Sequence, residues 1–414
     1  MPAQLSTFDA VLKDDYHGPV VEQLNQKNMF AAQIDKDTEN FVGRKWIQPL
    51  HVTRNTGVGA GTESSALPTA GNQGFVDIVG PIRMNRGQVR LTTAVIESAS
   101  KDRGSFVRAL ETEMNGLVND LSRDECRQTW GEANGRLATC GTTTASTTVT
   151  LAATTSDAQL RWIEDRGVVD IGTVATPTSI ASARTVTSVN YSAKTIVISG
   201  AAVTTSAAAF IFASGSGGAS SGSGTYADGQ SELTGVLAQV DDTSTLFTVN
   251  PSTYPRWKSQ VYSSVGSISE SALVKYVNDT EIASGETPDL LVGAYGVTRA
   301  IGNLLTSQKR VIDKVSLKGG WSGTSLDAVL AGGQGSYSVA IVPEKNVWNG
   351  YLFGFTTKYW KQMVLKDWDW MDADGSVLSR VSGFPFYEAT MEKFSEIVCT
   401  RRNAQFVAKG ITEA

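Results

Sequence analysis

A run of acidic residues near the end of the sequence could bind a cation: Asp367, Asp369, Asp372 and Asp374. Clustered carboxylates are the ligands that Ca²⁺ and Mg²⁺ prefer in proteins. An EF-hand loop aligned on Gly375 would place Trp370 and Val381 at ligand positions, so that motif is excluded. A cation site of another kind stays open beside the ordinary interpretation, which is an acidic turn between two strands.

Residues for other chemistry are scarce. The only histidines are His17 and His51, and no pair of His and Cys residues has zinc-ligand spacing. Gly218–Gly222 matches the nucleophile-elbow pattern, but no histidine follows it, whereas that fold needs one downstream. Gly57–Thr62 lacks the lysine of a phosphate-binding loop. We therefore predict that the chain is not an enzyme and that it has no catalytic residue and no cofactor.

Composition narrows the function classes further. The 414 residues include 36 basic and 41 acidic ones without a basic block, which argues against a nucleic-acid reader. The 41% hydrophobic content is enough for a core and excludes wholesale disorder. Three scattered cysteines form no disulfide framework and fit a reducing compartment. With no signal-peptide pattern and no apolar run of about 18 residues, we expect assembly in the cytoplasm and no membrane partner.

The first hundred residues predict an arm followed by a ribbon. Residues 1–50 are polar, with a short helical patch that begins near Pro19 and little core of its own. Strand-like runs at 75–83 and 88–96 flank Asn85-Arg86-Gly87, which we interpret as a turn. An isolated two-stranded hairpin is marginal in water, so this ribbon needs a partner.

The clearest helix is predicted over residues 105–130, after an N-cap at Ser105. Its apolar residues recur at steps of three and four and share one face: Phe106, Leu110, Met114, Leu117 and Leu121. Gly116 inside it marks a bend or a close approach, or has no meaning; both interpretations stay open.

The remaining sequence predicts a small inserted β-domain and a mixed region. Residues 141–231 are rich in Thr, Ser and Ala, with strand-like runs at 148–151, 167–171, 185–189 and 195–199 and a Gly/Ser-rich exit at 214–224. Residues 232–370 alternate helical and strand patterns, including a strand at 290–292 that precedes a helix. The aromatic stretch 351–370 predicts core packing.

Two stretches resemble the major capsid proteins of tailed bacteriophages, which have the Hong Kong 97-like capsid fold. The matching residues are Leu67-Pro68-Thr69-Ala70-Gly71-Asn72-Gln73, Pro81-Ile82-Arg83, Gly87-Gln88-Val89-Arg90-Leu91-Thr92, Ser105-Phe106-Val107-Arg108-Ala109-Leu110, Glu396-Ile397-Val398-Cys399 and Arg402-Asn403-Ala404-Gln405-Phe406-Val407. The order of arm, ribbon, long helix, mixed domain and terminal strands carries the resemblance more than any single motif.

The resemblance implies an α+β fold with six parts. These are an N-terminal arm (1–50), an extended β-ribbon or E-loop (51–97), the spine helix of a P-domain (98–140), an inserted small β-barrel-like domain (141–231), a mixed α/β A-domain with part of the P-domain (232–370) and terminal P-domain strands (371–414).

The implied function is structural. Such a subunit assembles with itself into hexamers and pentamers of an icosahedral virion shell that encloses double-stranded DNA and contacts it non-specifically. A portal protein is the implied partner, with a separate scaffold, a protease or a decoration protein as possible others. Some members cross-link through a ribbon lysine, but no lysine lies between Thr53 and Ala94, which argues against that route.

Residues expected at assembly contacts are the ribbon arginines and the apolar helix face. We hypothesise that Arg83, Arg86 and Arg90 meet carboxylates of a neighbouring subunit, because the planar guanidinium fork fixes geometry. A solvated ribbon face is the plain alternative. Phe106, Leu110, Met114, Leu117 and Leu121 would pack under the ribbon and against the terminal strands.

Two other functions stay open. The same fold could build a bacterial nanocompartment around an enzyme, although the polar arm, long ribbon and insertion favour the phage. A β-rich adhesin or receptor-binding protein would form a monomer or trimer and would need a secretion route. A hydrolase is disfavoured for want of histidines.

Overall fold

The computed structural model describes residues 29–38, 43, 45–94, 109–173, 176, 178–215, 225–226, 232–307, 314–317, 321–329, 336–372 and 377–414. The chain divides into two compact units. Unit 1 comprises residues 1–26, 86–123 and 368–392, and unit 2 comprises residues 27–85, 124–367 and 393–414. Each unit is described by itself.

A seven-stranded sheet is the largest element of unit 2. Its strands, in spatial order, are β15 (Gln260–Tyr262), β24 (Phe406–Ala408), β20 (Leu352–Phe355), β16 (Leu290–Gly293), β19 (Ser336–Pro343), β18 (Trp321–Val329) and β17 (Lys314–Leu317). All four residues of β16 are buried, as a central strand requires. The predicted strand at 290–292 and the helix after it are confirmed as β16 and α8 (Tyr295–Ser307).

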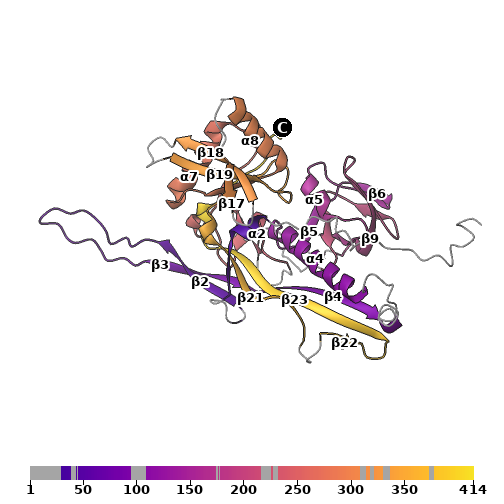
Figure 1. Cartoon of the computed structure of the whole chain (residues 1–414). Helices are drawn as coiled ribbons and strands as arrows, with labels where there is room; N and C mark the ends of the chain where they lie inside the picture. The colour runs from indigo at the N-terminus through magenta and orange to yellow at the C-terminus, as the bar shows by residue number, and fades with distance from the viewer. Residues whose placement is uncertain are drawn as a thin grey trace, which may run out of the picture. The chain divides into compact units, whose positions relative to one another are not determined.

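Helix α7 (Glu270–Ser284) accompanies α8 beside this sheet (Figure 1). The Ser269 side chain accepts a hydrogen bond from the Ala272 amide and begins α7. Gly285, with a φ of 73°, ends it in the left-handed conformation that favours glycine. Tyr276 of α7 stacks on Tyr262 of β15, with ring centroids 4.0 Å apart, which fixes the helix to the sheet edge.

The core of unit 2 contains a cluster of aromatic side chains. Phe353, Phe355 and Trp360 are at most 1% exposed, so the prediction of core packing is confirmed for these residues of the stretch 351–370. Phe30 comes from the short helix α2 (Met29–Gln33) and is fully buried. Its ring centroid lies 4.7 Å from that of Phe355, 5.2 Å from that of Trp360 and 5.5 Å from that of Trp130. The arm segment is therefore anchored in the aromatic core by Phe30, together with the buried Ile34.

Residues 136–213 form a closed six-stranded sheet within unit 2. Its strands, in spatial order, are β5 (Arg136–Thr139), β12 (Phe210–Ala213), β8 (Val168–Gly172), β9 (Ala181–Asn190), β10 (Thr195–Ile198) and β7 (Thr148–Thr150). The first and last strands are joined, because Cys140 pairs with Leu151 and the Gly141 amide donates to the Thr150 carbonyl at 2.7 Å. The four strands predicted between 148 and 199 are thus confirmed.

Smaller elements complete the β-domain. Strand β6 (Thr143–Ser146) pairs with β11 (Val203–Thr205), and helix α5 (Asp157–Trp162) begins at a capping box formed by Ser156 and Gln159. The predicted Gly/Ser-rich exit at 214–224 lies almost entirely outside the described residues, as does the nucleophile-elbow pattern at 218–222.

The ribbon pairs strands that the sequence did not predict as partners. Strand β2 (Lys45–Thr53) pairs antiparallel with β3 (Gly74–Pro81), and residues 54–73 connect them. The prediction that Asn85-Arg86-Gly87 forms the ribbon turn is wrong, because these residues lie inside one continuous strand, β4 (Arg83–Thr92), which pairs with β23 (Phe386–Cys399). The ribbon therefore begins inside the predicted arm and ends before β4.

The long helix α4 (Ala109–Thr129) confirms the helix predicted over 105–130; its start, with the Ser105 cap, lies outside the described residues. In unit 1 its apolar face lies over β4 at Gly87. A Cβ atom on Gly87 would lie 2.8 Å from a Leu117 methyl and 2.9 Å from a Leu121 methyl, so glycine permits the close packing. Around Gly116 no described atom outside the helix backbone lies within 4 Å of the position that a Cβ atom would take, so no close approach by the described residues requires this glycine.

The remaining described elements are short, apart from one strand of 11 residues. They are β1 (Asp35–Asp37), β13 (Thr225–Tyr226), α6 (Val236–Gln239), β14 (Thr245–Leu246), η1 (Pro255–Trp257), η3 (Thr357–Tyr359), β21 (Trp360–Trp370), β22 (Ser379–Arg380) and η4 (Arg402–Ala404). Strand β1 pairs in parallel with β21, and β22 pairs antiparallel with β23. The predicted terminal strands are confirmed as β23 and β24.

Candidate assembly surfaces

The ribbon is buried at its base and exposed beyond it. Trp46 of β2 and Ile78 of β3 join a buried cluster with Phe247, Trp257 and other residues of unit 2. From this base the ribbon projects away from the rest of unit 2 (Figure 1). Four of its apolar side chains are open to solvent, namely Ile47 (60%), Val58 (83%), Leu67 (91%) and Phe75 (66%), whereas Val52 is buried.

The connection at residues 54–73 is folded back on itself. The Asn55 side chain accepts a hydrogen bond from the Gly57 amide at 2.7 Å. A Cβ atom on Gly57 would lie 2.9 Å from both the Gly71 nitrogen and the Thr69 carbonyl oxygen, so the two limbs of the connection touch through their backbones. A connection that carries exposed apolar residues suits contact with another protein surface.

Arg83 is committed to an ion pair inside the chain. Its Nε donates to Glu396 Oε2 at 3.1 Å, and both side chains are buried. The same carboxylate accepts hydrogen bonds from the Thr234 amide at 2.8 Å, the Thr234 hydroxyl at 3.1 Å and the Ile397 amide at 3.0 Å. Burial raises the pKa of Glu396, while the Arg83 charge and these hydrogen bonds oppose the rise.

The other two predicted arginines also meet glutamates of strand β23. In unit 1, Arg86 lies 3.5 Å from Glu392 and Arg90 lies 3.1 Å from Glu388. The arginine side chains keep 55% and 59% of their surface exposed. They can therefore reach a further carboxylate, and their contact with a neighbouring subunit stays a prediction.

The predicted helix contacts are distributed differently. Leu117 and Leu121 lie over Gly87 of the same unit, and Met114 is half-buried on α4. Leu110 belongs to α4, and Phe106 lies outside the described residues. The contacts that the structure gives to Leu117 and Leu121 hold the subunit itself together, and a role between subunits stays a prediction.

The described residues of the acidic run do not form a group that could hold a cation. Asp367 lies 3.1 Å from the Lys36 ammonium and 3.4 Å from that of Lys393, so two cations already occupy its surroundings. Asp374 lies outside the described residues. In the part of the chain that the structure describes, no group of three or more His, Cys, Asp or Glu residues is placed to hold a metal ion.

Unit 2 also contains a set of buried charged residues that the sequence did not predict. Arg127, in the last turn of α4, donates two hydrogen bonds to Glu232 at 2.6 and 3.1 Å and a third to Asp124 at 2.8 Å. Burial lowers the pKa of Arg127, but the two carboxylates outweigh it and raise the pKa overall. Lys393, 3% exposed, donates to Glu125 at 2.6 Å. Only the Asp124–Arg127 spacing could have been recognised from the sequence.

No family model matches the chain, and no curated protein matches it in sequence. Solved structures match it over its whole length. A chain of the cyanophage A-1(L) capsid asymmetric unit has a TM-score of 0.61 at 9% identity, with 99% of this chain and all of that chain covered. A chain of the capsid of a native GTA particle has a TM-score of 0.51 at 10% identity, with complete coverage of both. An encapsulin of Synechococcus elongatus also matches, at a TM-score of 0.45 and 8% identity over 99% of this chain.

The likenesses to the cyanophage and GTA capsid chains define the fold. The chain has the Hong Kong 97-like capsid fold that the resemblance implied. Among the helices that the structure describes, none is long and apolar enough to cross a membrane.

Proposed function

We propose that this chain is the major capsid subunit of a tailed bacteriophage, with a structural and not an enzymatic role. It assembles into hexamers and pentamers of an icosahedral shell that encloses double-stranded DNA. The observation that carries the proposal is the ribbon. It projects from a buried base, exposes Val58 and Leu67 almost fully, and belongs to a fold that matches phage capsid chains from end to end.

The ribbon explains how assembly gains free energy. Burying apolar surface on a neighbour stabilises a contact by about 25 cal/mol per Å², so a few exposed apolar side chains contribute a few kcal/mol for each contact. Weak contacts of this size, repeated around a closed symmetric shell, hold the shell together through multivalency. During assembly, a single misplaced subunit can still dissociate. A portal protein, a scaffold, a protease or a decoration protein stay expectations of the resemblance.

The test begins with expression of the full chain alone. Negative-stain electron microscopy of the high-mass fraction should show closed shells, tubes, or isolated pentamers and hexamers. A monomer or trimer, even with a scaffold candidate co-expressed, would overturn the proposal. Shells isolated from their native source should hold DNA; shells that hold only an enzyme would favour a nanocompartment instead.

A matched pair of ribbon variants connects the ribbon to assembly. The double variant Val58→Asp/Leu67→Asp places charges where both side chains are exposed, so the subunit should fold normally and fail to form shells. The control, Thr62→Asp, adds a charge at an exposed polar position of the same connection and should assemble as the parent does. Equal yields of shells from both variants would show that Val58 and Leu67 do not contact a neighbouring subunit.

A further inference from the structure

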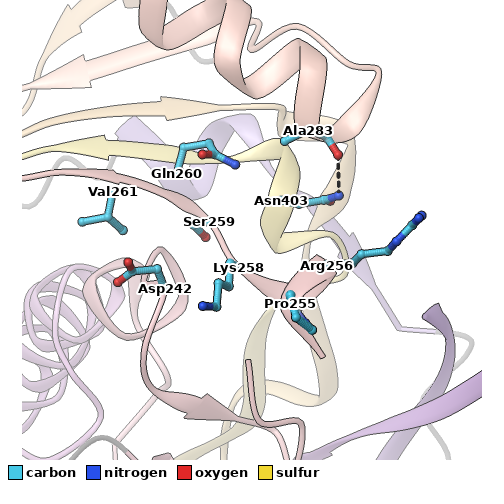
Figure 2. A pocket seen from close by; sticks show the side chains of 9 residues that line it. All are labelled: Asp242, Pro255, Arg256, Lys258, Ser259, Gln260, Val261, Ala283 and Asn403. Atoms are coloured by element: carbon cyan, nitrogen blue, oxygen red, sulfur yellow. Dashed lines mark hydrogen bonds between the residues drawn. The ribbon is translucent and has the colours of Figure 1, made fainter. Parts of the chain in front are cut away.

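A pocket of about 410 Å³ lies in unit 2 beside β15, the strand at one end of the seven-stranded sheet. Its lining comes from η1, from β15 and from the segments that carry Asp242, Ala283 and Asn403 (Figure 2). One lining contact is internal: the Asn403 amide donates to the Ala283 carbonyl at 3.1 Å.

The pocket lies across the free edge of β15. The Gln260 amide donates to the Gln405 carbonyl, and the Tyr262 carbonyl accepts from the Lys409 amide, so residues 260 and 262 bond toward β24. The backbone groups of Val261, between them, therefore face away from β24. Consecutive side chains of a strand point to opposite faces, yet Gln260 and Val261 both line the pocket. An extended segment could add to this edge as a further strand.

Two cations border the pocket. Arg256 and Lys258 flank Trp257, which is buried, and both are exposed. Neither forms an ion pair with a residue in the described part of the chain. Figure 2 shows Arg256 extending on the side of Asn403 and Lys258 on the side of Asp242. With Asp242 counted, the lining carries one net positive charge, divided between two separate positions.

A buried hydroxyl also lacks a partner. Ser259 is 3% exposed, and its Oγ makes no hydrogen bond with any described atom. A buried unpaired hydroxyl destabilises the folded protein, so a ligand or an ordered water that bonds to it would be favoured. The site therefore offers an outward-facing strand edge, two cations and an unpaired hydroxyl.

We propose that this pocket binds an extended, carboxylate-bearing segment of a neighbouring copy of the chain, which adds to the free edge of β15. The inference rests on the proposed shell function. Trp257 belongs to the same buried cluster as Trp46 and Ile78 of the ribbon base, so the pocket lies beside the point from which the ribbon projects.

Charge complementarity favours a second copy as the occupant. The chain carries 41 acidic and 36 basic residues, so a second copy contains more carboxylates than cations. Arg256 would pair with one of them through its planar fork, and Lys258 with a second as a point charge. The backbone of Val261 supplies one donor and one acceptor, which set the direction of the added strand.

The first experiment identifies the occupant directly. Lys258 is replaced by a photo-reactive benzoylphenylalanine, and isotopically heavy and light subunits are mixed before assembly. After illumination of purified shells, mass spectrometry should find cross-links between position 258 of one copy and an acidic peptide of another, as heavy–light pairs. Cross-links confined to one copy, cross-links to nucleic acid alone, or none at all would overturn the inference.

A charge reversal tests the energetic role. Arg256→Glu/Lys258→Glu should lower the yield of shells about tenfold, since about 1.4 kcal/mol per contact is a factor of ten. The unassembled variant should keep the circular dichroism and melting temperature of the parent. The control, Lys275→Glu, reverses an exposed charge on α7 and should leave the yield unchanged. If the parent forms shells and both variants match it, this inference fails while the shell function stands; if the parent forms none, the shell function itself fails.

Discussion

Arg83 and Glu396, 313 positions apart in the sequence, form a buried ion pair between strand β4 and strand β23. The carboxylate has four hydrogen-bond donors around it, from Arg83, Thr234 and Ile397. A carboxylate so surrounded is satisfied only while every donor is in place. The pair therefore fixes the register of β4 on β23 and, through β3, the root of the ribbon.

Replacing Arg83 by alanine should destabilise the subunit strongly. The variant leaves Glu396 buried without its cation, and breaking a buried pair from one side costs about 3–5 kcal/mol. Urea unfolding of the unassembled subunit at pH 7, followed by tryptophan fluorescence, measures the loss. Arg86→Ala is the matched control, since its pair with Glu392 leaves the arginine 55% exposed and should contribute only about 0–1 kcal/mol. Equal losses would show that burial does not decide the contribution.

The two glycines near the long helix should respond in opposite directions to alanine. Gly87→Ala places a Cβ atom within 3 Å of the methyls of Leu117 and Leu121, and such overpacking costs about 1–3 kcal/mol. Gly116→Ala adds a methyl where no described atom outside the helix backbone lies within 4 Å and should stabilise α4 by about 1 kcal/mol. Melting temperatures of the two variants, measured side by side, check the signs. A stabilised Gly87 variant would mean that the helix does not lie on β4.

Phe30→Ala should weaken the packing of the arm segment against the aromatic core and destabilise the subunit. The side chain is fully buried against Trp130, Phe355 and Trp360, and truncation of a buried phenylalanine costs about 3–5 kcal/mol. Because water would gain access to Trp130 and Trp360, the tryptophan emission of the folded subunit should shift to the red. Phe384→Ala, at a position 57% exposed, is the control and should change neither property. An unshifted emission in the Phe30 variant would show that this ring does not shield Trp130 and Trp360 from water.

Asp241 predicts an acid-sensitive contribution to stability. Burial alone would raise the pKa of its carboxyl, but hydrogen bonds from Ser244 and Thr243 and the charge of Arg402 lower it to about 2. A depressed pKa stabilises the fold above the unfolded value, near 3.8, and the contribution disappears as the pH falls through about 2. The group is partly open to solvent, so screening reduces the contribution to about 1 kcal/mol. Asp241→Asn should lower stability at pH 7 by that amount and flatten the decline between pH 4 and 2; parallel curves for parent and variant would contradict this role.

Local patterns predicted the elements better than their partners. Apolar residues at helical spacing gave α4, and alternating or continuous apolar runs gave β7 to β10, β16, β23 and β24. The predicted pairing of the ribbon was wrong because the runs at 75–83 and 88–96 satisfy the local rules for a hairpin around Asn85-Arg86-Gly87. Nothing local reveals that Gly87 instead accommodates Leu117 and Leu121, or that β3 pairs with β2.

The candidate contacts show the same limit. Arg83, Arg86 and Arg90 were predicted to meet carboxylates of a neighbouring subunit, whereas in the structure each meets a glutamate of its own chain about 300 positions later. Sequence spacing gives the chemistry of such a pair and not its geometry, because long-range strand pairing decides which side chains meet. The pocket beside β15 had no signal at all, since its lining is gathered from distant segments around an edge that only the sheet order defines.

Strand β24 lies between β15 and β20, although it is the last strand that the structure describes in the chain. A nascent polypeptide still emerging from the ribosome therefore lacks the strand that joins β15 to the rest of the sheet. Strand β15, which borders the pocket, joins the seven-stranded sheet only after residues 406–408 have been synthesised. The sheet edge at β15 would thus form only at the end of translation. Unfinished chains would therefore not compete with complete ones for places in a growing lattice.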